Sequence, residues 1–184
     1  MSTQPRITPV TDVADEVAEI LEGALTIDGR PINIFGVLAH HPKLMKRFNL
    51  FAGFLLNKGL LPARERELVI LRIGWNARAE YEFGQHTLIG RRSGLTDDEI
   101  VALTGDPAAG DWSDDDRALI ALADELAEHD RVTDETWAAL SARWNDAELI
   151  ELLIVAGCYR MVSGFLNSAG VVLDDGVPGF PGSD

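Results

Sequence analysis

The sequence has little cysteine, no long apolar run and few basic residues. Its single cysteine among 184 residues, Cys158, excludes an internal disulfide framework and fits a reducing, cytoplasmic environment. No stretch of about 20 residues is both apolar and uncharged, which argues against a membrane span. The first twelve residues, MSTQPRITPVTD, lack the apolar segment of a secretory signal. We therefore expect a cytoplasmic protein that does not cross a membrane.

Basic residues are outnumbered by acidic ones. Lysine and arginine number 16 against 30 aspartates and glutamates, which gives a formal net charge of −14. A phosphate backbone would be repelled, so neither DNA nor RNA is expected as a partner. The charge is uneven, because residues 64–92 contain six arginines and four glutamates. This stretch either tolerates an anionic small-molecule substrate or pairs its arginines with neighbouring carboxylates.

Signatures of several other protein classes are missing. The sequence has no glycine-rich phosphate loop, no nucleophilic serine elbow and no alternating pattern of convincing strand length. Helical periodicity runs through it instead, and we expect an all-α fold. The predicted helices begin and end near residues 12–24, 33–39, 42–59, 62 to a break at 74–76, 78–93, 96–103, 113–127, 133–143 and 147–169. Two segments, LVILRIGW (68–75) and LIELLIVAGCY (149–159), are apolar on nearly every side and must be central.

The length and an apolar content of 46 % suit a single domain over residues 1–173. Residues 174–184, DDGVPGFPGSD, form a tail rich in proline and glycine. Phe180 is the exception in this tail, and our hypothesis is that the tail packs on a neighbouring subunit. Helices that are apolar on more than one face exceed what a small single layer hides, which indicates a homo-oligomer.

Residues 64–92 also hold the one constellation that looks chemical, namely Glu67, Glu82 and His86. Glu82 and His86 are four residues apart, so on a helix they share one face, where Ala79 leaves space beside them. Glu67 begins an apolar segment and is expected to be drawn inward. Burial raises a carboxyl pKa and a nearby cation lowers it, so these groups suit proton transfer near neutral pH. An exposed ion pair is the competing interpretation of the Glu82–His86 spacing.

These residues lie within a longer pattern. It consists of Leu61-Pro62-Ala63-Arg64, Glu67-Leu68, Glu80-Tyr81-Glu82-Phe83, His86 and Gly94-Leu95-Thr96, with His41-Pro42 and a hydrophobic helix upstream. The pattern resembles the carboxymuconolactone decarboxylase and alkylhydroperoxidase-D-like (AhpD-like) family over about residues 35–105. The resemblance implies an all-α, AhpD-like helical bundle that is oligomeric, as a trimer or a hexamer.

One departure from the family pattern bears on the activity. The peroxidase branch carries Cys-x-x-Cys, and the corresponding positions here are Ala79 and Glu82. A dithiol relay needs two sulfurs, and Cys158 lies in a different segment, so a thiol peroxidase is disfavoured. The resemblance favours the decarboxylase branch, whose members need no metal or organic cofactor. Glu67, Glu82 and His86 also offer fewer nitrogen and sulfur ligands than zinc prefers, so no metal site is expected.

The resemblance implies a lyase that removes carbon dioxide from a small carboxylated lactone or keto acid and then protonates carbon. His86 is the expected proton donor. Glu82 orients the imidazole or carries the proton in its place, and Glu67 sets the protonation state of the pair. Two alternatives remain. One is another proton-transfer enzyme on this scaffold, such as an isomerase or cyclase; the other is a non-enzymatic oligomeric binding protein whose three residues only hold helices together.

Four further residues have two interpretations each. His40 and His41 precede a helix, where they either line a pocket or cap the helix end. Trp75 and Tyr81, close to the chemical constellation, either wall a pocket or pack in the core. The sequence names neither the substrate nor the residues that bind it.

Overall fold

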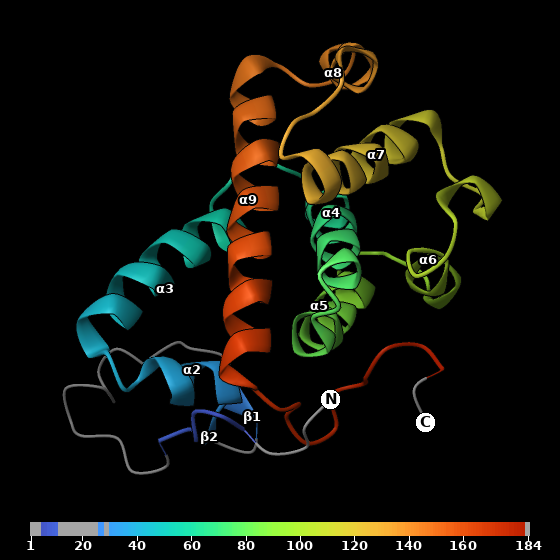
Figure 1. Cartoon of the computed structure of the whole chain (residues 1–184). Coiled ribbons are helices and arrows are strands. Elements are labelled where there is room, and N and C mark those ends of the chain that lie inside the picture. The colour runs from blue at the N-terminus through green and yellow to red at the C-terminus, as the bar shows by residue number, and fades with distance from the viewer. Residues whose placement is uncertain (1–4, 11–25, 28–29, 183–184) are drawn as a thin grey trace.

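The computed structural model describes residues 5–10, 26–27 and 30–182. In this part of the chain, eight α-helices make up most of the fold (Figure 1). They are α2 (Asn33–Leu38), α3 (Pro42–Asn57), α4 (Ala63–Asn76), α5 (Glu80–Arg92), α6 (Asp97–Ala102), α7 (Asp114–His129), α8 (Asp134–Ser141) and α9 (Asp146–Ala169). The predicted all-α fold is confirmed. The helix predicted over residues 12–24 lies outside the described residues.

A two-stranded hairpin and a 3₁₀ turn complete the described secondary structure. The strands β1 (Thr26–Ile27) and β2 (Arg30–Pro31) pair in antiparallel register just before α2. A 3₁₀ turn, η1 (Pro107–Ala109), lies in the connection between α6 and α7. Neither element was predicted, because two or three residues are too few to leave a periodic pattern in the sequence.

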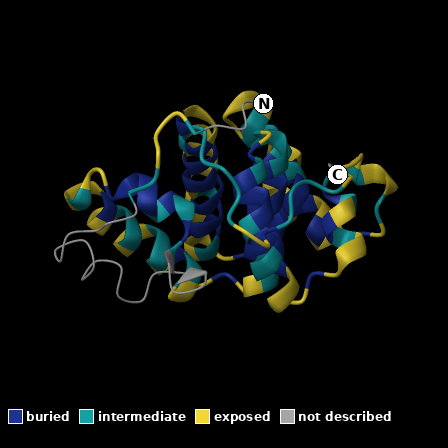
Figure 2. Ribbon diagram, turned by 90° about the horizontal axis from the view of Figure 1, so that it is seen from below, coloured by how far each residue is buried: buried dark blue, intermediate teal, exposed yellow. Residues whose placement is uncertain are grey.

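The two segments predicted to be central form the core. In α4, residues 68–71 are fully removed from solvent, and α9 buries residues along most of its length. α4 packs against α5, α7 and α9, which together enclose it (Figure 1). Figure 2 shows the buried residues gathered where these helices meet, with the exposed residues on the outer surface. Burial of a near-continuous apolar helix on several sides therefore organises the bundle.

The turn between α4 and α5 lies later than expected. A break was predicted at residues 74–76, but α4 continues through Gly74 to Asn76. The chain turns at Arg78, whose backbone has the left-handed conformation with a φ of 53°. A glycine costs a helix interior roughly 1 kcal/mol relative to alanine, which the packing of α4 outweighs. The turn folds α5 back against α4 and so brings two separate sequence segments together.

Several helices begin at a residue whose side chain caps them. The Thr96 hydroxyl accepts a hydrogen bond from the backbone of Glu99, whose carboxylate accepts one from the backbone of Thr96. These two bonds form a capping box at the start of α6. Asn145 and Glu148 form a second capping box at the start of α9. Thr133 caps α8, which ends at residue 141, two residues before its predicted end.

The C-terminal tail packs on its own chain. The ring of Phe180 lies 5.1 Å from the ring of Trp75 and 5.2 Å from that of Phe83, measured between centroids. The tail crosses α5 at Gly84, where a Cβ atom would lie 2.3 Å from the carbonyl oxygen of Pro178. The hypothesis that this tail docks on a neighbouring subunit stays a prediction, and Phe180 already packs within its own chain. Two aromatic rings of its own chain supply the surface that it covers.

α9 does not meet the expectation that every segment is too polar or too short to span a membrane. This helix of 24 residues passes that test by length and composition, because an 18-residue window within it has a mean hydropathy of 1.7. More than half of the apolar window, 56 %, is buried inside the fold, as in the core helix of a globular protein. Contacts with α4, α5, α7 and α8 account for this burial, and we assign α9 to the core.

Candidate active site

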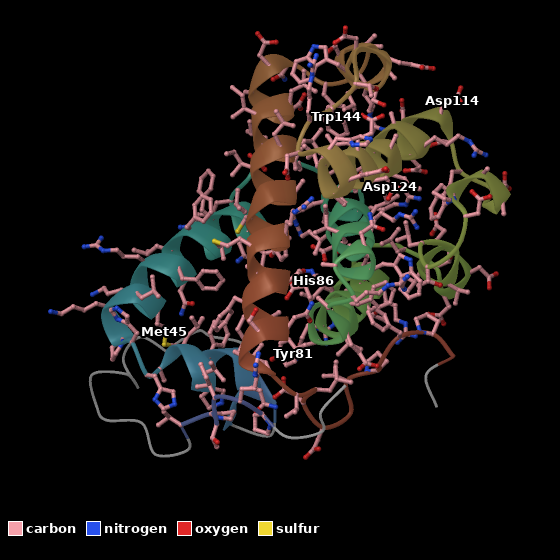
Figure 3. The ribbon with its side chains drawn as sticks, viewed as in Figure 1. Met45, Tyr81, His86, Asp114, Asp124 and Trp144 are labelled. Carbon is pink, nitrogen blue, oxygen red and sulfur yellow. The ribbon has the colours of Figure 1, made fainter. Side chains whose placement is uncertain are left out.

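The three chemical residues predicted from the sequence lie together where α4 meets α5. Nδ1 of His86 lies 2.6 Å from Oε2 of Glu67, and Nε2 of His86 lies 3.1 Å from Oε1 of Glu82. Glu82 and His86 are one turn apart on α5, while Glu67 reaches them from α4. We call these three residues the carboxylate–histidine cluster. Figure 3 shows His86 between α5 and α9.

The carboxylate–histidine cluster is buried. Glu67 is 0 % exposed, Glu82 3 % and His86 5 %. Burial alone would lower the pKa of His86, but the carboxylates of Glu67 and Glu82 outweigh burial and raise it to about 10. The imidazole is therefore protonated at neutral pH, and each ring nitrogen faces a carboxylate. The cluster is thus not the exposed ion pair that the spacing alone also allowed.

Two further side chains fix the cluster in place. Nε of Arg66 donates to Oε1 of Glu67 at 3.0 Å, so each oxygen of Glu67 has its own cationic partner. The ring of Tyr159 on α9 packs edge-on against the imidazole, with centroids 4.9 Å apart and planes at 84°. Burial, followed by the charges of Glu82 and Glu67, raises the pKa of Tyr159 well above its usual value. Its hydroxyl therefore stays neutral beside the charged cluster.

A cavity of about 780 Å³ opens beside the cluster, between α2, α3, α5 and α9. Glu82 and His86 line it, whereas Glu67 is not among its lining residues. The other lining residues with polar or ionisable side chains are Lys46, Asn49, Asn57, Arg66, Tyr81, Gln85, Arg92, Cys158 and Tyr159. Most of the remaining wall is apolar. A concave site of this size with a few convergent polar groups is typical of small-molecule binding.

Cys158 lines the same cavity from α9, a position that its sequence segment did not reveal. Burial, and then the charge of Glu82, raises the pKa of its thiol to about 11. At neutral pH the side chain is therefore a thiol, and the thiolate is the reactive form. Because the sequence has no second cysteine, no dithiol relay can form within the chain.

Tyr81 forms part of the cavity wall, which is one of the two roles that the sequence left open. Its hydroxyl donates to Oδ2 of Asp174 at 2.7 Å and accepts from the backbone N–H of Ile34 at 3.1 Å. Gln85 donates to the same carboxylate oxygen, and the backbone N–H of Asn33 donates to the other. Asp174 is the first residue of the tail, and its carboxylate thus ties the tail to α2 and α5 beside the cavity.

His40 and His41 are exposed, and neither lines the cavity. Nδ1 of His41 accepts from the backbone N–H of Leu44 at 3.4 Å, which caps the start of α3. Nε2 of His40 lies 2.9 Å from the carbonyl oxygen of Thr8. Trp75 packs with other aromatic rings under the tail. His41 thus caps a helix, His40 contacts the backbone, and Trp75 packs in an aromatic group.

The arginines of residues 64–92 divide into two groups. Several pair with carboxylates outside the cavity: Arg64 with Glu99 and Asp116, Arg72 with Asp124, and Arg91 with Asp97. Arg66 differs, because it lines the cavity and uses only Nε on Glu67. Its two terminal nitrogens have no hydrogen-bond partner among the residues that the structure describes. Pairing with carboxylates, one of the two sequence interpretations, is therefore confirmed for Arg64, Arg72 and Arg91, while an anionic substrate stays a prediction.

Sequence reasoning did not single out Arg66, Tyr159 or Cys158 as part of a site. A signal for Arg66 was present, since Glu67 next to it was expected to be drawn inward and a buried carboxylate calls for a cationic partner. No comparable signal existed for the pair on α9. Those two residues sit in an apolar run, and only the packing of α9 against α5 brings them to the cavity.

The fold and the site together define an all-α, AhpD-like bundle with an acid–base cluster beside a cavity. Solved structures share this fold at low sequence identity. A peroxidase-related protein from Silicibacter sp. TM1040 is 14 % identical with a TM-score of 0.82, covering 95 % of this chain and 96 % of that one. A peroxidase-related protein with an alkylhydroperoxidase AhpD core, from Ralstonia eutropha JMP134, is 18 % identical with a TM-score of 0.77, covering 92 % of each chain. The debrominase Bmp8 is 14 % identical, and its ligand-free structure has a TM-score of 0.78 and covers 95 % of each chain. A variant of Bmp8 was solved with 2,3,4-tribromopyrrole.

Part of the chain matches the carboxymuconolactone decarboxylase family. The sequence pattern of that family matches residues 42–125, from the first residue of α3 into α7. The matched region contains all three members of the carboxylate–histidine cluster. The resemblance seen in the sequence is thus confirmed for this part of the chain. No curated protein matches the chain.

Proposed function

We propose that this chain is a cofactor-free carboxy-lyase that decarboxylates a small carboxylated lactone or keto acid. One observation carries the proposal: a protonated imidazole is held between two buried carboxylates at the wall of a cavity of small-molecule size. The match to the carboxymuconolactone decarboxylase family supports the same reaction class. The chemistry required of the protein is proton delivery, and the cluster contains the groups for it.

The proposed reaction has two steps. First, the bond between the carboxylate carbon and its neighbour breaks, carbon dioxide leaves, and the electron pair is delocalised into an adjacent carbonyl. Second, a proton is delivered to the carbon that carried the carboxylate. His86 stores this proton, since its pKa is raised to about 10. Its Nε2 faces Glu82, which lines the cavity, so the proton passes to the substrate directly or through the Glu82 carboxyl. Solvent then restores the proton to the imidazole.

Glu67 has a different task in this proposal. It does not line the cavity, so it acts on the substrate only through His86. By accepting a hydrogen bond from Nδ1, it fixes the ring orientation and favours the imidazolium form. Arg66 donates to the second oxygen of Glu67, which fixes the orientation of that carboxylate. Because both carboxylates raise the pKa of His86, loss of either one is expected to lower the proton affinity of the imidazole.

Arg66 also favours an anionic substrate. Its side chain lines the cavity and is buried, and its terminal nitrogens lack hydrogen-bond partners in the described part of the chain. These nitrogens are not among the buried unpaired atoms of the described residues, so they are open to the cavity, where a substrate carboxylate would accept hydrogen bonds from both. Lys46 and Arg92 add positive charge to the same cavity. We therefore propose that a carboxylate of the substrate binds at Arg66.

The test is to incubate the purified protein with a panel of small carboxylated lactones and β-keto acids and to measure carbon dioxide release. With a substrate from this panel, His86→Ala is expected to lose turnover by about 10²–10⁴-fold, the usual contribution of a positioned acid–base group. Circular dichroism should show that the variant still folds. His40→Ala is the matched control, because that histidine is exposed and lies outside the cavity. Unchanged carbon dioxide release in His86→Ala would refute the assignment.

The same assay separates the proposal from its alternatives. Conversion of a β-keto acid without release of carbon dioxide would indicate an isomerase or a cyclase. Binding without turnover across the whole panel would indicate a binding protein. Cys158→Ala is expected to retain turnover, since the proposed reaction uses no sulfur, and loss of activity in this variant would reopen thiol chemistry.

A further inference from the structure

The proposed decarboxylation creates negative charge at a place that the carboxylate–histidine cluster does not cover. When the carbon–carbon bond breaks and carbon dioxide leaves, its electron pair moves into the neighbouring carbonyl, whose oxygen becomes negative. Enzymes usually stabilise such an oxygen with a hydrogen-bond donor that is already in position. Both ring nitrogens of His86 face carboxylates, so the cluster holds the proton for carbon but has no free donor for this oxygen. A second donor is therefore needed in the cavity wall.

The hydroxyl of Tyr159 is a donor that the fold leaves unused. Among the described residues that line the cavity, Tyr81 and Tyr159 carry a hydroxyl. The Tyr81 hydroxyl donates to Asp174 and accepts from the backbone N–H of Ile34. The Tyr159 hydroxyl has no hydrogen-bond partner in the part of the chain that the structure describes, and it is not one of the buried unpaired atoms there. It is therefore open to the cavity with its donor free.

The side-chain amides of the wall offer no equivalent donor. Asn57 donates to a backbone carbonyl of its own helix, and Gln85 donates to the first residue of the tail. Asn49 lies on α3, an element that contributes nothing to the cluster. The ring of Tyr159, in contrast, lies 4.9 Å from the imidazole ring, measured between centroids. Of the neutral donors in the wall, the Tyr159 hydroxyl is therefore the one fixed beside the source of the proton.

Packing holds the ring of Tyr159 in one place. The residue is 4 % exposed, and its ring stands edge-on to that of His86 at 84°. Its neighbours on α9, Cys158 and Val162, line the same cavity. A donor whose ring is fixed by its surroundings keeps its position while charge develops on the substrate. It therefore requires no reorganisation at that moment.

The Tyr159 hydroxyl also keeps its proton during the reaction. Burial, followed by the charges of Glu82 and Glu67, raises the pKa of Tyr159 well above its usual value, and the charge of Arg66 opposes this only in part. A hydrogen bond from such a donor strengthens as negative charge grows on the oxygen that accepts it. The bond therefore stabilises the transition state more than the bound substrate, which is the condition for raising the rate.

The charges of the cavity wall favour an additional negative charge. Among the described lining residues, four groups are positive at neutral pH, against the carboxylate of Glu82. The four are Lys46, Arg66, Arg92 and the protonated His86. A substrate carboxylate bound at Arg66 leaves this wall positive, so an oxygen that becomes negative is attracted rather than repelled.

We propose that Tyr159 is a further catalytic residue, whose hydroxyl donates a hydrogen bond to the carbonyl oxygen of the substrate as that oxygen becomes negative. This inference rests on the proposed function, because it assigns a task within the decarboxylation. The electron pair left by carbon dioxide passes to the oxygen and returns to form the new carbon–hydrogen bond when the cluster delivers a proton. Tyr159 keeps its own proton throughout and is unchanged at the end of the cycle.

A coloured anion tests the hydroxyl without any turnover. 4-Hydroxy-3-nitrobenzoate carries a carboxylate for Arg66 and a phenolate oxygen that stands in for the negative oxygen of the substrate, and its absorbance reports binding. At a pH where the free probe is ionised, the wild type should bind it about ten-fold more tightly than Tyr159→Phe does, as expected of a hydrogen bond to a charged group. Benzoate has no phenolate oxygen, so calorimetry should show equal affinity for both proteins.

Tyr81→Phe is the matched control, because Tyr81 is the only other tyrosine of the chain and lines the same cavity. Its hydroxyl is used within the chain, so this variant should keep the preference for the phenolate over benzoate. Tyr159→Phe should fold as the wild type does, since the ring remains, and circular dichroism checks this. Three results would overturn the proposal: equal phenolate affinity in the wild type and Tyr159→Phe, a wild type that does not bind the phenolate, or an equal loss of benzoate affinity in Tyr159→Phe.

Turnover gives a second test that separates this inference from the proposed function. With a substrate found in the panel, Tyr159→Phe should lower kcat by about 10²–10³-fold, the usual cost of removing one such donor. KM should stay nearly unchanged, because the bond forms as charge develops. Confirmed release of carbon dioxide with an unchanged kcat in Tyr159→Phe would overturn the role of Tyr159 and leave the decarboxylation standing. Phenolate binding that depends on Tyr159, without carbon dioxide release from any member of the panel, would refute only the decarboxylation and would still support the hydroxyl as a donor to a negative oxygen.

Discussion

Arg64 and Glu67 lie one turn apart on α4 and belong to two different clusters of charged side chains. The two clusters have the same arrangement of charges. In each cluster a cation is held between two carboxylates: Arg64 between Glu99 and Asp116, and His86 between Glu67 and Glu82. We call the first of these the arginine cluster. The arginine cluster lies outside the cavity and is partly exposed, whereas the carboxylate–histidine cluster is buried beside it.

The two clusters differ in what their cation can release. Hydrogen bonding to Asp116, partly opposed by burial, raises the pKa of Arg64, but a guanidinium never loses its proton in a protein anyway. The same arrangement moves the pKa of His86 from 6.5 to about 10, across the physiological range. Identical charge patterns therefore stabilise the fold in one place and store a transferable proton in the other.

The largest expected difference between the clusters is in turnover. Glu82→Gln keeps the side-chain shape and removes the charge that faces Nε2 of His86, so turnover of a substrate found in the panel should fall by about 10²-fold or more. Glu99→Gln makes the same change in the arginine cluster and should leave turnover nearly unchanged. Steady-state rates of both variants at one pH provide the measurement. Similar losses of turnover in both variants would show that catalysis depends equally on the charges of the two clusters.

The second difference is in the pH dependence of stability. The folded pKa of His86, about 10, exceeds its ordinary value of 6.5, so the folded state holds this proton more tightly than the unfolded state does. The resulting stabilisation is complete below pH 6.5 and is lost as the pH rises to about 10. Within this window the free energy of unfolding should fall by up to about 1.4 kcal/mol per pH unit.

Urea unfolding at several pH values, followed by circular dichroism, measures this slope. His86→Gln removes the titrating group and keeps a hydrogen-bonding side chain, so the slope should disappear in that variant below pH 9, the ordinary pKa of the Cys158 thiol. His41→Gln, on the exposed cap of α3, serves as the control and should retain the wild-type slope. A wild type whose stability does not change between pH 6.5 and 10 would mean that the cluster does not hold its proton as the geometry indicates.

The helices were predictable because each one buries an apolar stripe and most begin at a recognisable cap. The turn between α4 and α5 was placed too early, since Gly74 attracted the prediction while the chain actually turns at Arg78. A left-handed backbone at an arginine has no sequence signature comparable to that of glycine. Local patterns therefore predicted the elements well and their connections less well.

Within the site, the sequence predicted the residues that lie on one helix or at the edge of an apolar run. Glu82 and His86 follow from spacing, and Glu67 follows from burial of the segment it begins. Tyr159 and Asp174 could not be predicted, because each reaches the site from a distant part of the chain. Their positions depend on how α9 and the tail pack, which no local pattern encodes.

The smallest effect expected is in the arginine cluster, where only stability is at stake. Arg64→Met should lower the free energy of unfolding by about 1 kcal/mol, the upper end for partly exposed ion pairs, because Asp116, whose side chain is 9 % exposed, loses its cation. Arg91→Met should cost less, since both members of the Arg91–Asp97 pair are far more exposed. Although burial would raise the pKa of Asp116, Arg64 and Ser113 lower it.

The contribution of this pair to stability is therefore present above pH 3.8, the ordinary pKa of an aspartate, and is lost as the pH falls through the lowered value. The difference between wild type and Arg64→Met should accordingly persist in urea unfolding above pH 3.8 and disappear in stronger acid. Turnover of Arg64→Met should equal that of the wild type throughout. If this variant instead lost turnover as Glu82→Gln does, the two clusters would be coupled through α4, and the separation of stabilising charge from proton-storing charge would not hold.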